Sequence, residues 1–440
     1  MTTLSQDSLG SVSFITMGCA KNEVDSEHMA RKLIRAGYSI VADPEEADVI
    51  VVNTCSFIQV ATEESIEAIL DAAALDSVSG GNAKLVVAGC MPARYGNELE
   101  KELPEVDSFV TCADEVNIVD TVDRLLGIER LVGDGVSFPI NESDSGLVSS
   151  YVKTSDGCDR FCAYCTIPYI RGRYHSFTEQ EIIDEVSLAI DRGAREIVLI
   201  AQDTGRWGSD LTPPSSLAQL LAHLAETWPQ VWFRVMYIQP EGVTEELIAT
   251  VRDHENICSY FDIPFQHANP RILKSMNRKG SAGEFLELIE LIRDQIPHVT
   301  LRTTLIAGYP GETEDDFEEL CEFVEEADLD YVGVFPYSRE EGTRAFDLDG
   351  QLDDEEKASR AQTLRDLSDS LSSVRISQRI GQRVPVIVCG REEDGQLYGR
   401  AQCQAPDVDG VTYLDRGELG DVVDVVIDGT LLYEMEGTVS

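Results

Sequence analysis

Short apolar runs alternate with longer stretches of mixed polarity through the first third of the chain. Three of these runs read SVSFITMGC, ADVIVVNTC and KLVVAGC, and two stretches between them read DSEHMARKLIRAG, which ends at Gly37, and ATEESIEAILDAAA. Short apolar runs separated by segments of helical length are typical of buried parallel strands joined by helices. We therefore predict an open parallel α/β domain over residues 11–140.

The same alternation resumes with a longer period over residues 149–376. Helical stretches such as TEQEIIDEVSLAIDRGA separate six apolar runs: SSYVKTS, REIVLIAQDT, VWFRVMYI, SYFDIPFQ, VTLRTTLIAG and YVGVFPY. Six such strand–helix units predict a partial or full parallel (β/α) barrel, and the polar stretch 353–376 predicts a helix that leaves it. Residues 131–148 are polar and rich in glycine and serine, which predicts a linker between these two domains.

The pattern changes again over residues 377–440. Short apolar runs, among them QRVPVIVCG, GVTYL and DVVDVVIDG, are separated by turns that contain glycine and aspartate. This pattern is typical of a small antiparallel β-barrel. The fold class predicted for the whole chain is therefore α/β, with three domains in series.

Composition adds a strong charge bias to this picture. The chain has 440 residues, with 35 Lys and Arg against 80 Asp and Glu, and its net charge is −45. A hydrophobic fraction of 43% excludes wholesale disorder. Phosphate contacts by Lys and Arg dominate nucleic-acid binding, so free RNA or DNA is a poor default partner and a basic protein is a better one. The alternative is that the acidic residues serve only solubility.

No feature of the sequence predicts export or membrane insertion. The first residues, MTTLSQDSLG, lack the basic start and apolar run of a signal peptide. No stretch approaches the roughly 18 consecutive apolar residues of a membrane span. We therefore expect a soluble cytosolic protein. Eleven cysteines in a reducing compartment favour metal ligation over a disulfide framework.

Three of the cysteines follow the predicted strands of the first domain. Cys19, Cys55 and Cys90, here called the auxiliary triad, each stand where an apolar run ends. The carboxyl ends of parallel strands share one edge of a sheet, and ligands of open α/β folds bind at that edge. Three thiols there favour one shared metal site. The alternative is that each cysteine is an ordinary core residue.

A second group of cysteines forms the strongest chemical motif. Cys158, Cys162 and Cys165, here called the radical triad, have the spacing C-x-x-x-C-x-x-C directly after the first strand of the predicted barrel. The carboxyl end of such a strand is the catalytic face of a parallel barrel. Three thiolates can bind three irons of a four-iron cluster and leave the fourth iron open. The alternative is a zinc site with a distant fourth ligand.

This motif, with Tyr164 before its last cysteine, resembles the signature loop of radical S-adenosylmethionine enzymes. In that family the open iron chelates S-adenosylmethionine, and one electron cleaves it to methionine and a 5′-deoxyadenosyl radical. AQDT after the second barrel strand resembles the segment that meets the methionyl amine. GYPGET after the fifth resembles the turn beside the adenosyl and methionyl groups, although a Gly-Pro-Gly turn is more often only a turn. The resemblance implies cofactor contacts from Tyr164, Gln202, Asp203, Gly308, Pro310 and Gly311.

The three predicted domains together resemble the methylthiotransferases among these enzymes. MGCAKNEVDSE, VVNTCSFI and VAGCMPARY match the blocks that carry the family's auxiliary-cluster ligands, although Ala20 stands where proline is common. The resemblance implies a 4Fe–4S cluster on each triad and a TRAM-like last domain for substrate recognition. It also implies two S-adenosylmethionine molecules: one methylates a sulfide at the auxiliary cluster, and the other supplies the radical that activates the substrate.

Two substrates compete within this family: an adenosine of transfer RNA, and the β-carbon of an aspartate in small-subunit ribosomal protein S-twelve. DSEHM after GCAKNEV, DIPFQHANPRIL and GRAQCQAPDVDGVTYL resemble blocks of the ribosomal-protein branch. Residues 377–440 hold five Arg, no Lys and twelve Asp and Glu, and a net charge of −7 suits a basic protein loop better than RNA.

The resemblance thus implies methylthiolation of S-twelve, free or in the small subunit, with a low-potential electron donor and no membrane partner. A transfer-RNA methylthiotransferase is the alternative within the family. An alternative of another class is a non-catalytic iron–sulfur or zinc-binding scaffold.

Several other residues have two interpretations. Arg234 and Arg302 either face the S-adenosylmethionine carboxylate or form ion pairs within the barrel. His267 either lines the site or is a hydrogen-bonded structural histidine. Cys112 and the other cysteines outside the triads are predicted to be buried or incidental thiols.

Overall fold

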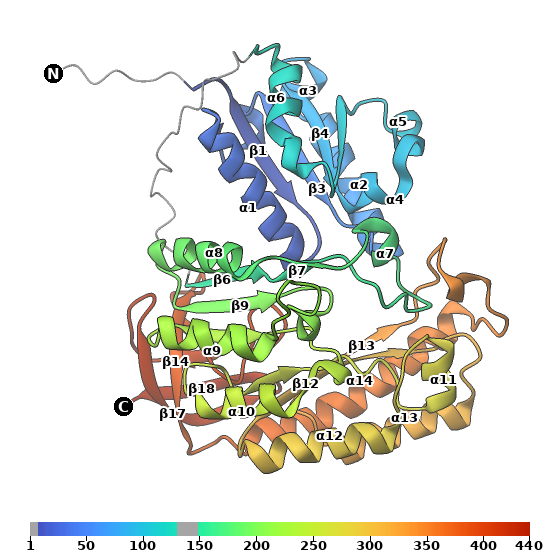
Figure 1. Cartoon of the computed structure of the whole chain (residues 1–440), viewed down its shortest axis with the longest axis vertical. Coiled ribbons are helices and arrows are strands. Elements are labelled where there is room, and N and C mark those ends of the chain that lie inside the picture. Colours follow the sequence, from blue (N-terminus) through green and yellow to red (C-terminus); the bar gives the residue numbers. More distant parts are fainter. Residues whose placement is uncertain (1–7, 130–147) are drawn as a thin grey trace. The chain divides into compact units, whose positions relative to one another are not determined.

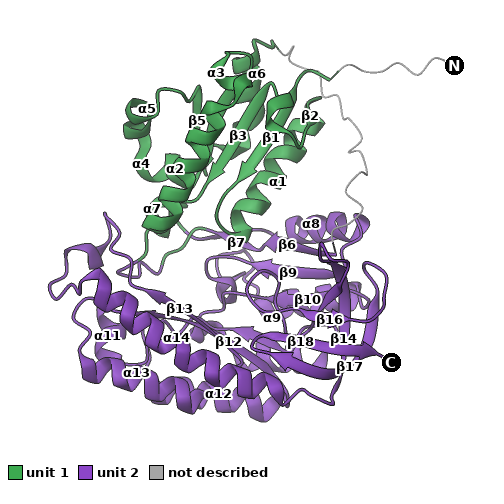
Figure 2. Cartoon of the chain, turned by 180° about the vertical axis from the view of Figure 1, so that it is seen from behind, with its two compact units in different colours: residues 1–143, 157–159, 165–173 green, residues 144–156, 160–164, 174–440 purple. Residues whose placement is uncertain are grey.

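The computed structural model describes residues 8–129 and 148–440, and their contacts divide the chain into two compact units. Unit 1 comprises residues 1–143, 157–159 and 165–173, and unit 2 comprises the remainder (Figure 2). The linker predicted over residues 131–148 lies outside the described residues, except for Val148. Within the described ranges, no helix is long and apolar enough to cross a membrane.

Unit 1 is built on a five-stranded parallel sheet with the strand order β2-β1-β3-β4-β5 (Figure 1). Its strands are β1 (Ser11–Thr16), β2 (Ser39–Ile40), β3 (Val49–Thr54), β4 (Lys84–Gly89) and β5 (Ser108–Thr111). Its helices are α1 (Ala20–Arg35), α2 (Gln59–Ala74), α3 (Asp76–Ser79), α4 (Cys90–Tyr95), α5 (Leu99–Glu102), α6 (Ile118–Leu126) and, from later in the chain, α7 (Ile167–Ile170). The predicted parallel α/β fold is confirmed.

The apolar runs of unit 1 are continuous because both faces of the sheet are covered. Along β3, Val49 and Val51 pack in one core cluster with α1 and α6, whereas Ile50 and Val52 pack in another with α2 and α4. Successive side chains of a strand point to opposite faces, so a strand buried on both sides shows no polar alternation.

Helix α1 begins five residues earlier than the hydrophobic pattern predicted. The pattern placed its start at Asp25, but the helix begins at Ala20. The first turns carry polar residues, of which Asn22 and Asp25 are buried and bonded to other parts of unit 1. Buried polar side chains that have partners can occupy a core-facing position, and the hydrophobic pattern does not show them.

In unit 2, six parallel strands form two adjoining sheets with the orders β6-β9-β10 and β11-β12-β13. A bridge between Phe233 and Ile257 links the sheets, so the strands form the wall of a partial barrel as predicted. The six strands are β6 (Ser149–Lys153), β9 (Glu196–Ile200), β10 (Trp232–Val235), β11 (Tyr260–Asp262), β12 (Thr300–Ala307) and β13 (Tyr331–Pro336), and β7 (Ser155–Asp156) pairs with β8 (His175–Ser176).

The helices of unit 2 follow the strands in sequence, and one long helix leaves the partial barrel where the polar stretch predicted it. They are α8 (Glu179–Asp191), α9 (Leu217–Thr227), α10 (Glu245–Asp253), α11 (Pro270–Ser275), α12 (Ala282–Gln295), α13 (Glu314–Ala327) and α14 (Asp354–Ser377).

The C-terminal residues form a closed five-stranded barrel with the order β14-β15-β16-β18-β17. Its strands are β14 (Arg383–Arg391), β15 (Leu397–Ala401), β16 (Thr412–Leu414), β17 (Val422–Leu431) and β18 (Glu434–Val439). Four neighbouring pairs are antiparallel as predicted, but β16 and β18 pair in parallel. Five strands cannot alternate in direction around a closed ring, so one parallel pair is required.

Buried charges fix this barrel to the six-stranded wall. Glu196 on β9 accepts from Arg234 on β10 at 2.8 Å and from Arg400 on β15 at 2.5 Å, and all three side chains are almost fully buried. Arg302 on β12 pairs with Asp262 at 2.9 Å. Arg234 and Arg302 therefore form ion pairs, which is the second of their two interpretations.

Asp409 of the C-terminal barrel gives this interface a pH dependence. Its fully buried side chain lies 3.5 Å from Arg302 and accepts a 2.6 Å hydrogen bond from the hydroxyl of Tyr260. Burial, opposed by the charge of Arg302, raises the pKa of Asp409 from 3.8 to about 6. Because the folded pKa lies above the unfolded one, the stabilisation is complete below the unfolded pKa and is lost as pH rises through the folded pKa. The loss is on the order of 3 kcal/mol.

We expect Asp409→Asn to remove this dependence, because an amide keeps the shape of the side chain and does not ionise. The free energy of unfolding from urea titration, measured at pH 4.5 and 7, should fall less with rising pH in this variant than in the parent chain. Asp394→Asn, which changes an exposed carboxyl, serves as the control. An identical pH profile for Asp409→Asn and the parent would contradict the prediction.

Candidate active site

The auxiliary triad lies at the carboxyl edge of the unit 1 sheet. Cys55 follows β3 directly, Cys90 follows β4 directly, and Cys19 lies three residues after β1 at the N-terminus of α1. Gly18 allows the loop that carries Cys19 to approach the loop that carries Cys55. It has a φ of +98°, and a Cβ there would lie 2.4 Å from the Cβ and 2.9 Å from the Sγ of Cys55. Only glycine fits such a close approach in this conformation.

Hydrogen bonds hold the strand ends around these thiols. Ser65 on α2 clamps Cys55, because its Oγ accepts from the backbone N of Cys55 at 3.1 Å and donates to the carbonyl at 2.8 Å. The amide of Asn22 on α1 donates to the carbonyl of Thr54 at 2.8 Å, and Asn53 donates to the carbonyl of Asn22 at 2.9 Å. These hydrogen bonds tie the end of β3 to α1 and α2.

The three thiols lie close enough to affect one another electrostatically. Burial raises the pKa of Cys55 to about 11, and the charges of Cys90 and Cys19 add to the increase. The pKa of Cys90 is lowered, because the thiol of Cys112 donates a hydrogen bond to it and the Arg171 guanidinium lies beside it. Thiolates are the metal-binding form of cysteine, so three thiolates gathered here would suit a cationic group that neutralises their charges.

The described residues contain no group of three His, Cys, Asp or Glu side chains arranged to hold a single metal ion. A 4Fe–4S cluster binds each thiolate through a different iron and therefore spreads its ligands over a larger body than one ion does. The donor set of each triad, three thiols, fits such a cluster with one open iron.

The loop of the radical triad divides between the two units. Cys158 and Cys165 group with unit 1, and Cys162 groups with unit 2. In unit 2, the residues after α11 pin the middle of the loop: Asn277 donates to the carbonyls of Arg160 and Phe161 at 2.9 and 3.0 Å. The side chain of Arg278 forms a hydrogen bond with that of Cys162.

Two predicted cofactor contacts, Gln202 and Asp203, follow β9 in unit 2. One oxygen of Asp203 accepts from Arg160 at 2.6 Å, and the amide of Gln202 donates to Asp156 at 3.0 Å. The second carboxylate oxygen of Asp203, Oδ1, and the side-chain oxygen of Gln202, Oε1, are buried and have no hydrogen-bond partner in the described part of the chain. Burial raises the pKa of Asp203 against the attraction of Arg160. Two buried acceptors without donors fit the amine of a methionyl group.

The other predicted contacts, Gly308, Pro310 and Gly311, form a turn after β12. Gly308 and Gly311 have φ angles of +77° and +79°, a region that favours glycine. The Glu312 carboxylate holds the turn closed by accepting from the backbone N of Gly308 at 3.0 Å. His267 lies 3.3 Å from Glu312, and both side chains are fully buried. Of the two interpretations of His267, this placement favours a structural histidine.

Tyr164 joins the radical-triad loop to this turn within unit 2. It packs against a small apolar cluster that includes Ala163, Tyr309 and Tyr337. The rings of Tyr309 and Tyr337 meet edge to face with centroids 5.4 Å apart, and both residues are buried. These two tyrosines therefore pack as core residues and position the loop beside the turn.

A substitution at Glu312 tests whether its buried carboxylate supports the turn after β12. It also pairs with Arg360 of α14 at 2.9 Å, so Glu312→Gln would remove a buried charge and leave Arg360 partly unpaired. We expect a loss of about 1–3 kcal/mol in the free energy of unfolding, because buried hydrogen bonds of Glu312 are weakened while Glu356 and Glu314 still pair with Arg360. Urea denaturation measures this loss, and equilibrium binding of S-adenosylmethionine should weaken in parallel.

Glu314→Gln is the matched control for this prediction. Glu314 pairs with the same Arg360 at 3.2 Å, but its side chain is 68% exposed. An exposed pair is worth roughly 0–1 kcal/mol. Equal losses in the two variants would show that burial of Glu312 does not matter.

Sequence analysis did not identify several residues that shape the site. Arg160, Arg171 and Arg278 lie within or soon after recognised motifs, but nothing in a single sequence shows which distant group each one contacts. The available signal was the position of Arg160 and Arg171 beside the motif cysteines, and of Arg278 soon after the DIPFQHANPRIL block. Glu312 lies inside GYPGET and was treated only as part of a turn.

Comparison with protein families divides the chain in the same order as the fold. Residues 11–111 match the family described as uncharacterized protein family UPF0004. Residues 152–324 match the radical SAM superfamily, and residues 380–439 match the TRAM domain. These ranges contain the auxiliary triad, the radical triad and the closed barrel, respectively.

Solved structures share the fold at low sequence identity. The radical S-adenosylmethionine methyltransferase TsrM from Kitasatospora setae matches with a TM-score of 0.54 and 13% identity, covering 74% of this chain and 73% of that chain. The cobalamin-dependent radical enzyme OxsB matches with a TM-score of 0.53 and 12% identity, covering 82% and 56%. Both matches concern the fold alone.

Curated relatives match along nearly the whole chain. A protein of Clostridioides difficile named ribosomal protein uS12 methylthiotransferase RimO is 42% identical over 434 residues, covering 96% of this chain and 97% of the relative. Proteins with the same name from Trichlorobacter lovleyi and Geobacter sulfurreducens are 42% and 41% identical, again over 96% and 97% of this chain. The chain therefore belongs to the radical SAM methylthiotransferase family, among the relatives named RimO.

Proposed function

We propose that the protein transfers a methylthio group to the β-carbon of an aspartate in ribosomal protein uS12. The observation that carries this proposal is identity of about 40% over nearly the full length with proteins named ribosomal protein uS12 methylthiotransferase RimO. An aspartate β-carbon holds its hydrogen too firmly for any side-chain base at neutral pH. The reaction therefore needs radical chemistry, which is the chemistry of the superfamily that residues 152–324 match.

The cofactors proposed are two 4Fe–4S clusters, one on each cysteine triad, and S-adenosylmethionine. Tyr164, Gln202, Asp203, Gly308, Pro310 and Gly311 would line the S-adenosylmethionine site. When bound, these groups supply the radical and the methylthio group, two S-adenosylmethionine molecules being used for each product.

The chain's own residues hold and orient these groups. The unpartnered oxygens of Gln202 and Asp203 would accept hydrogen bonds from the methionyl amine. Arg278 orients the side chain of Cys162, and Glu312 keeps the GYPGET turn closed. The apolar cluster around Tyr164 keeps water from this side of the loop.

Contacts within unit 1 join the chain that follows Cys165 to the edge that carries the auxiliary triad. Thr166, the residue after Cys165, donates from its hydroxyl to the carbonyl of Phe57, two residues after Cys55, at 3.3 Å. Helix α7 then packs on α4, which begins at Cys90. The last thiol of the radical triad is thus followed at once by chain that contacts the edge carrying the auxiliary triad.

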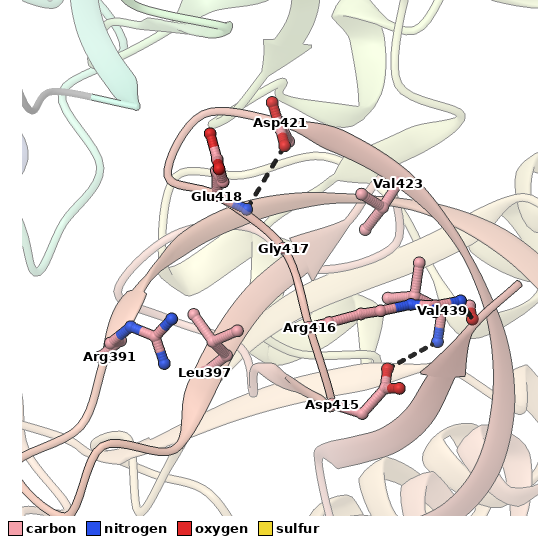
Figure 3. A pocket seen from close by; sticks show the side chains of 9 residues that line it. All are labelled: Arg391, Leu397, Asp415, Arg416, Gly417, Glu418, Asp421, Val423 and Val439. Atoms are coloured by element: carbon pink, nitrogen blue, oxygen red, sulfur yellow. Dashed lines mark hydrogen bonds between the residues drawn. The ribbon is translucent and has the colours of Figure 1, made fainter.

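The closed barrel is proposed to bind the basic substrate loop. It carries a net charge of −7 over residues 377–440. An open pocket of about 560 Å³ on the barrel is lined by the carboxylates of Asp415, Glu418 and Asp421 and by the guanidinium groups of Arg391 and Arg416 (Figure 3). Asp415 and Asp421 accept from backbone N–H groups, of Val439 and Glu418 respectively. The acidic potential of the barrel as a whole, and not of this pocket alone, attracts Lys and Arg side chains and repels phosphate.

The proposed setting is the reducing cytosol, with a low-potential electron donor as a further partner. None of the eleven cysteines, all of which the structure describes, forms a disulfide, which suits a reducing compartment. A donor is required because cleavage of S-adenosylmethionine consumes one electron.

A substrate-choice experiment tests the function. The protein is reconstituted anaerobically with iron and sulfide and given S-adenosylmethionine, sulfide and dithionite. The basic loop of uS12 and unmodified transfer RNA are offered in parallel and analysed by mass spectrometry. We expect a methylthio mass gain on the aspartate of the peptide alone. A gain on adenosine alone would replace the proposal with the transfer-RNA activity, and a colourless protein containing zinc would refute both.

A further inference from the structure

A buried arginine after the radical triad reaches the auxiliary triad inside unit 1. Arg171 follows α7, and its side chain is 3% exposed. Its Nη2 pairs with Asp25 on α1 at 2.8 Å, bonds to the Oδ1 of Asn22 at 3.1 Å, and lies 3.8 Å from the Sγ of Cys90. One guanidinium thus touches a buried carboxylate, a buried amide and a proposed cluster ligand.

The same contacts extend to a second thiol of the triad. The Oδ1 of Asn22, which Arg171 contacts, also accepts from the Sγ of Cys19 at 3.8 Å. Asn22 is itself fixed at both ends, because its amide donates to Thr54 and its carbonyl accepts from Asn53. Arg171 is therefore part of the framework that holds the carboxyl edge of the sheet, and it reaches that framework from six residues after Cys165.

Burying a cation in this position costs free energy, so stability alone does not explain why an arginine stands here. Two charged side chains, Arg171 and Asp25, are both almost fully buried, and an apolar pair of similar volume is often as stable or more stable. Asp25 neutralises the guanidinium without withdrawing it from Cys90. A planar group with several N–H donors can bond to a carboxylate and a thiolate together, which an ammonium on a flexible stem does less well.

We propose that Arg171 is a positioning residue for the auxiliary cluster, holding the Cys90 thiolate by a charged hydrogen bond and raising the reduction potential of that cluster. This rests on the proposed function, because it assumes a cluster on the auxiliary triad. Hydrogen bonds to ligand sulfurs and nearby positive charge stabilise the reduced, more negative form of an iron–sulfur cluster. Arg171 also ties the chain that follows the radical triad to this cluster.

The test isolates the auxiliary cluster in the full-length chain. Cys158, Cys162 and Cys165 are all replaced by alanine, so that one site is left to load. Asp25→Asn is added to this background, because it prevents an uncompensated buried carboxylate when Arg171 is changed. Variants with Arg171→Gln or Arg171→Lys are then compared with the Asp25→Asn parent. The readouts are iron per chain and the midpoint of an EPR-monitored redox titration with dithionite.

We expect Arg171→Gln to lower the ratio of reduced to oxidised cluster about tenfold at a fixed potential, equal to about 59 mV for one electron. Arg171→Lys keeps the charge but loses the planar fork, so it should recover part of this shift. The control is Lys84→Gln, which removes an exposed cation that pairs with Asp107 at 2.9 Å, at the end of β4 opposite to Cys90; its midpoint should stay close to that of the parent.

The outcomes separate this inference from the function on which it rests. A parent variant that binds no iron refutes the auxiliary cluster, and the role of Arg171 falls with it. A loaded parent whose midpoint is unchanged in Arg171→Gln refutes the role of Arg171 alone. If the Arg171→Gln variant binds no iron, the midpoint of the Arg171→Lys variant is compared with that of the parent instead. An unchanged midpoint in Arg171→Lys then overturns the proposal.

Discussion

Cys162→Ala should abolish the reductive cleavage of S-adenosylmethionine. Cys162 is the middle ligand of the proposed radical-triad cluster, and alanine offers no donor to iron. Removing one of only three thiolates leaves a four-iron cluster with two protein ligands, so the iron content should fall from about eight to about four per chain. The measurement is 5′-deoxyadenosine formed under dithionite, by chromatography and mass spectrometry, together with iron analysis of the same samples.

Cys321→Ala provides the control for this loss. Cys321 is a half-buried thiol on α13 with a pKa raised to about 11 by burial and neighbouring glutamates, so it has little thiolate character. This variant should keep its iron and its cleavage activity. Full cleavage by Cys162→Ala would contradict the assignment of the radical triad, whatever the substrate of the enzyme.

The positions of the triad cysteines could be predicted because they depend on local patterns. An apolar run such as VIVVNTC marks a strand buried on both faces, and the next residue necessarily lies at the carboxyl edge of the sheet. Parallel connectivity then places Cys55 and Cys90 at the same edge, since β3 and β4 are neighbours. The six-stranded wall of unit 2 was predictable for the same reason.

The remaining features depend on contacts between distant segments. Arg171 and Asp25 are separated by more than a hundred positions, and no local sequence pattern predicts that they form an ion pair. Arg234 could equally have faced a ligand, and only the placement of Glu196 and Arg400 decides that it does not. The parallel pair β16–β18 follows from closure of the barrel, which strand-like runs do not reveal. Pairing of charges and closure of sheets are properties of the assembled fold.

Cys55→Ser should give the opposite phenotype to Cys162→Ala. Cys55 is one of the two buried members of the auxiliary triad, and Ser65 clamps its backbone. Serine preserves the size of the side chain and this clamp. The hydroxyl is a poor ligand for iron, so the iron content should again fall by about half. Methylthiolation of the uS12 peptide should be lost, because the group to be transferred has no site. Cleavage of S-adenosylmethionine to 5′-deoxyadenosine should continue, since the radical triad is intact.

Only the pair of variants distinguishes two separate clusters from one cofactor shared by six cysteines. With separate clusters, each variant loses about half of the iron, and 5′-deoxyadenosine production survives in Cys55→Ser alone. If both variants lost all iron and all cleavage, the six thiols would be acting as one structural unit, and the division of labour between the triads would be wrong. If Cys55→Ser still methylthiolated the peptide, the auxiliary triad would not carry the transferred sulfur. Thermal unfolding of both variants near that of the parent chain would show that these losses reflect chemistry and not unfolding.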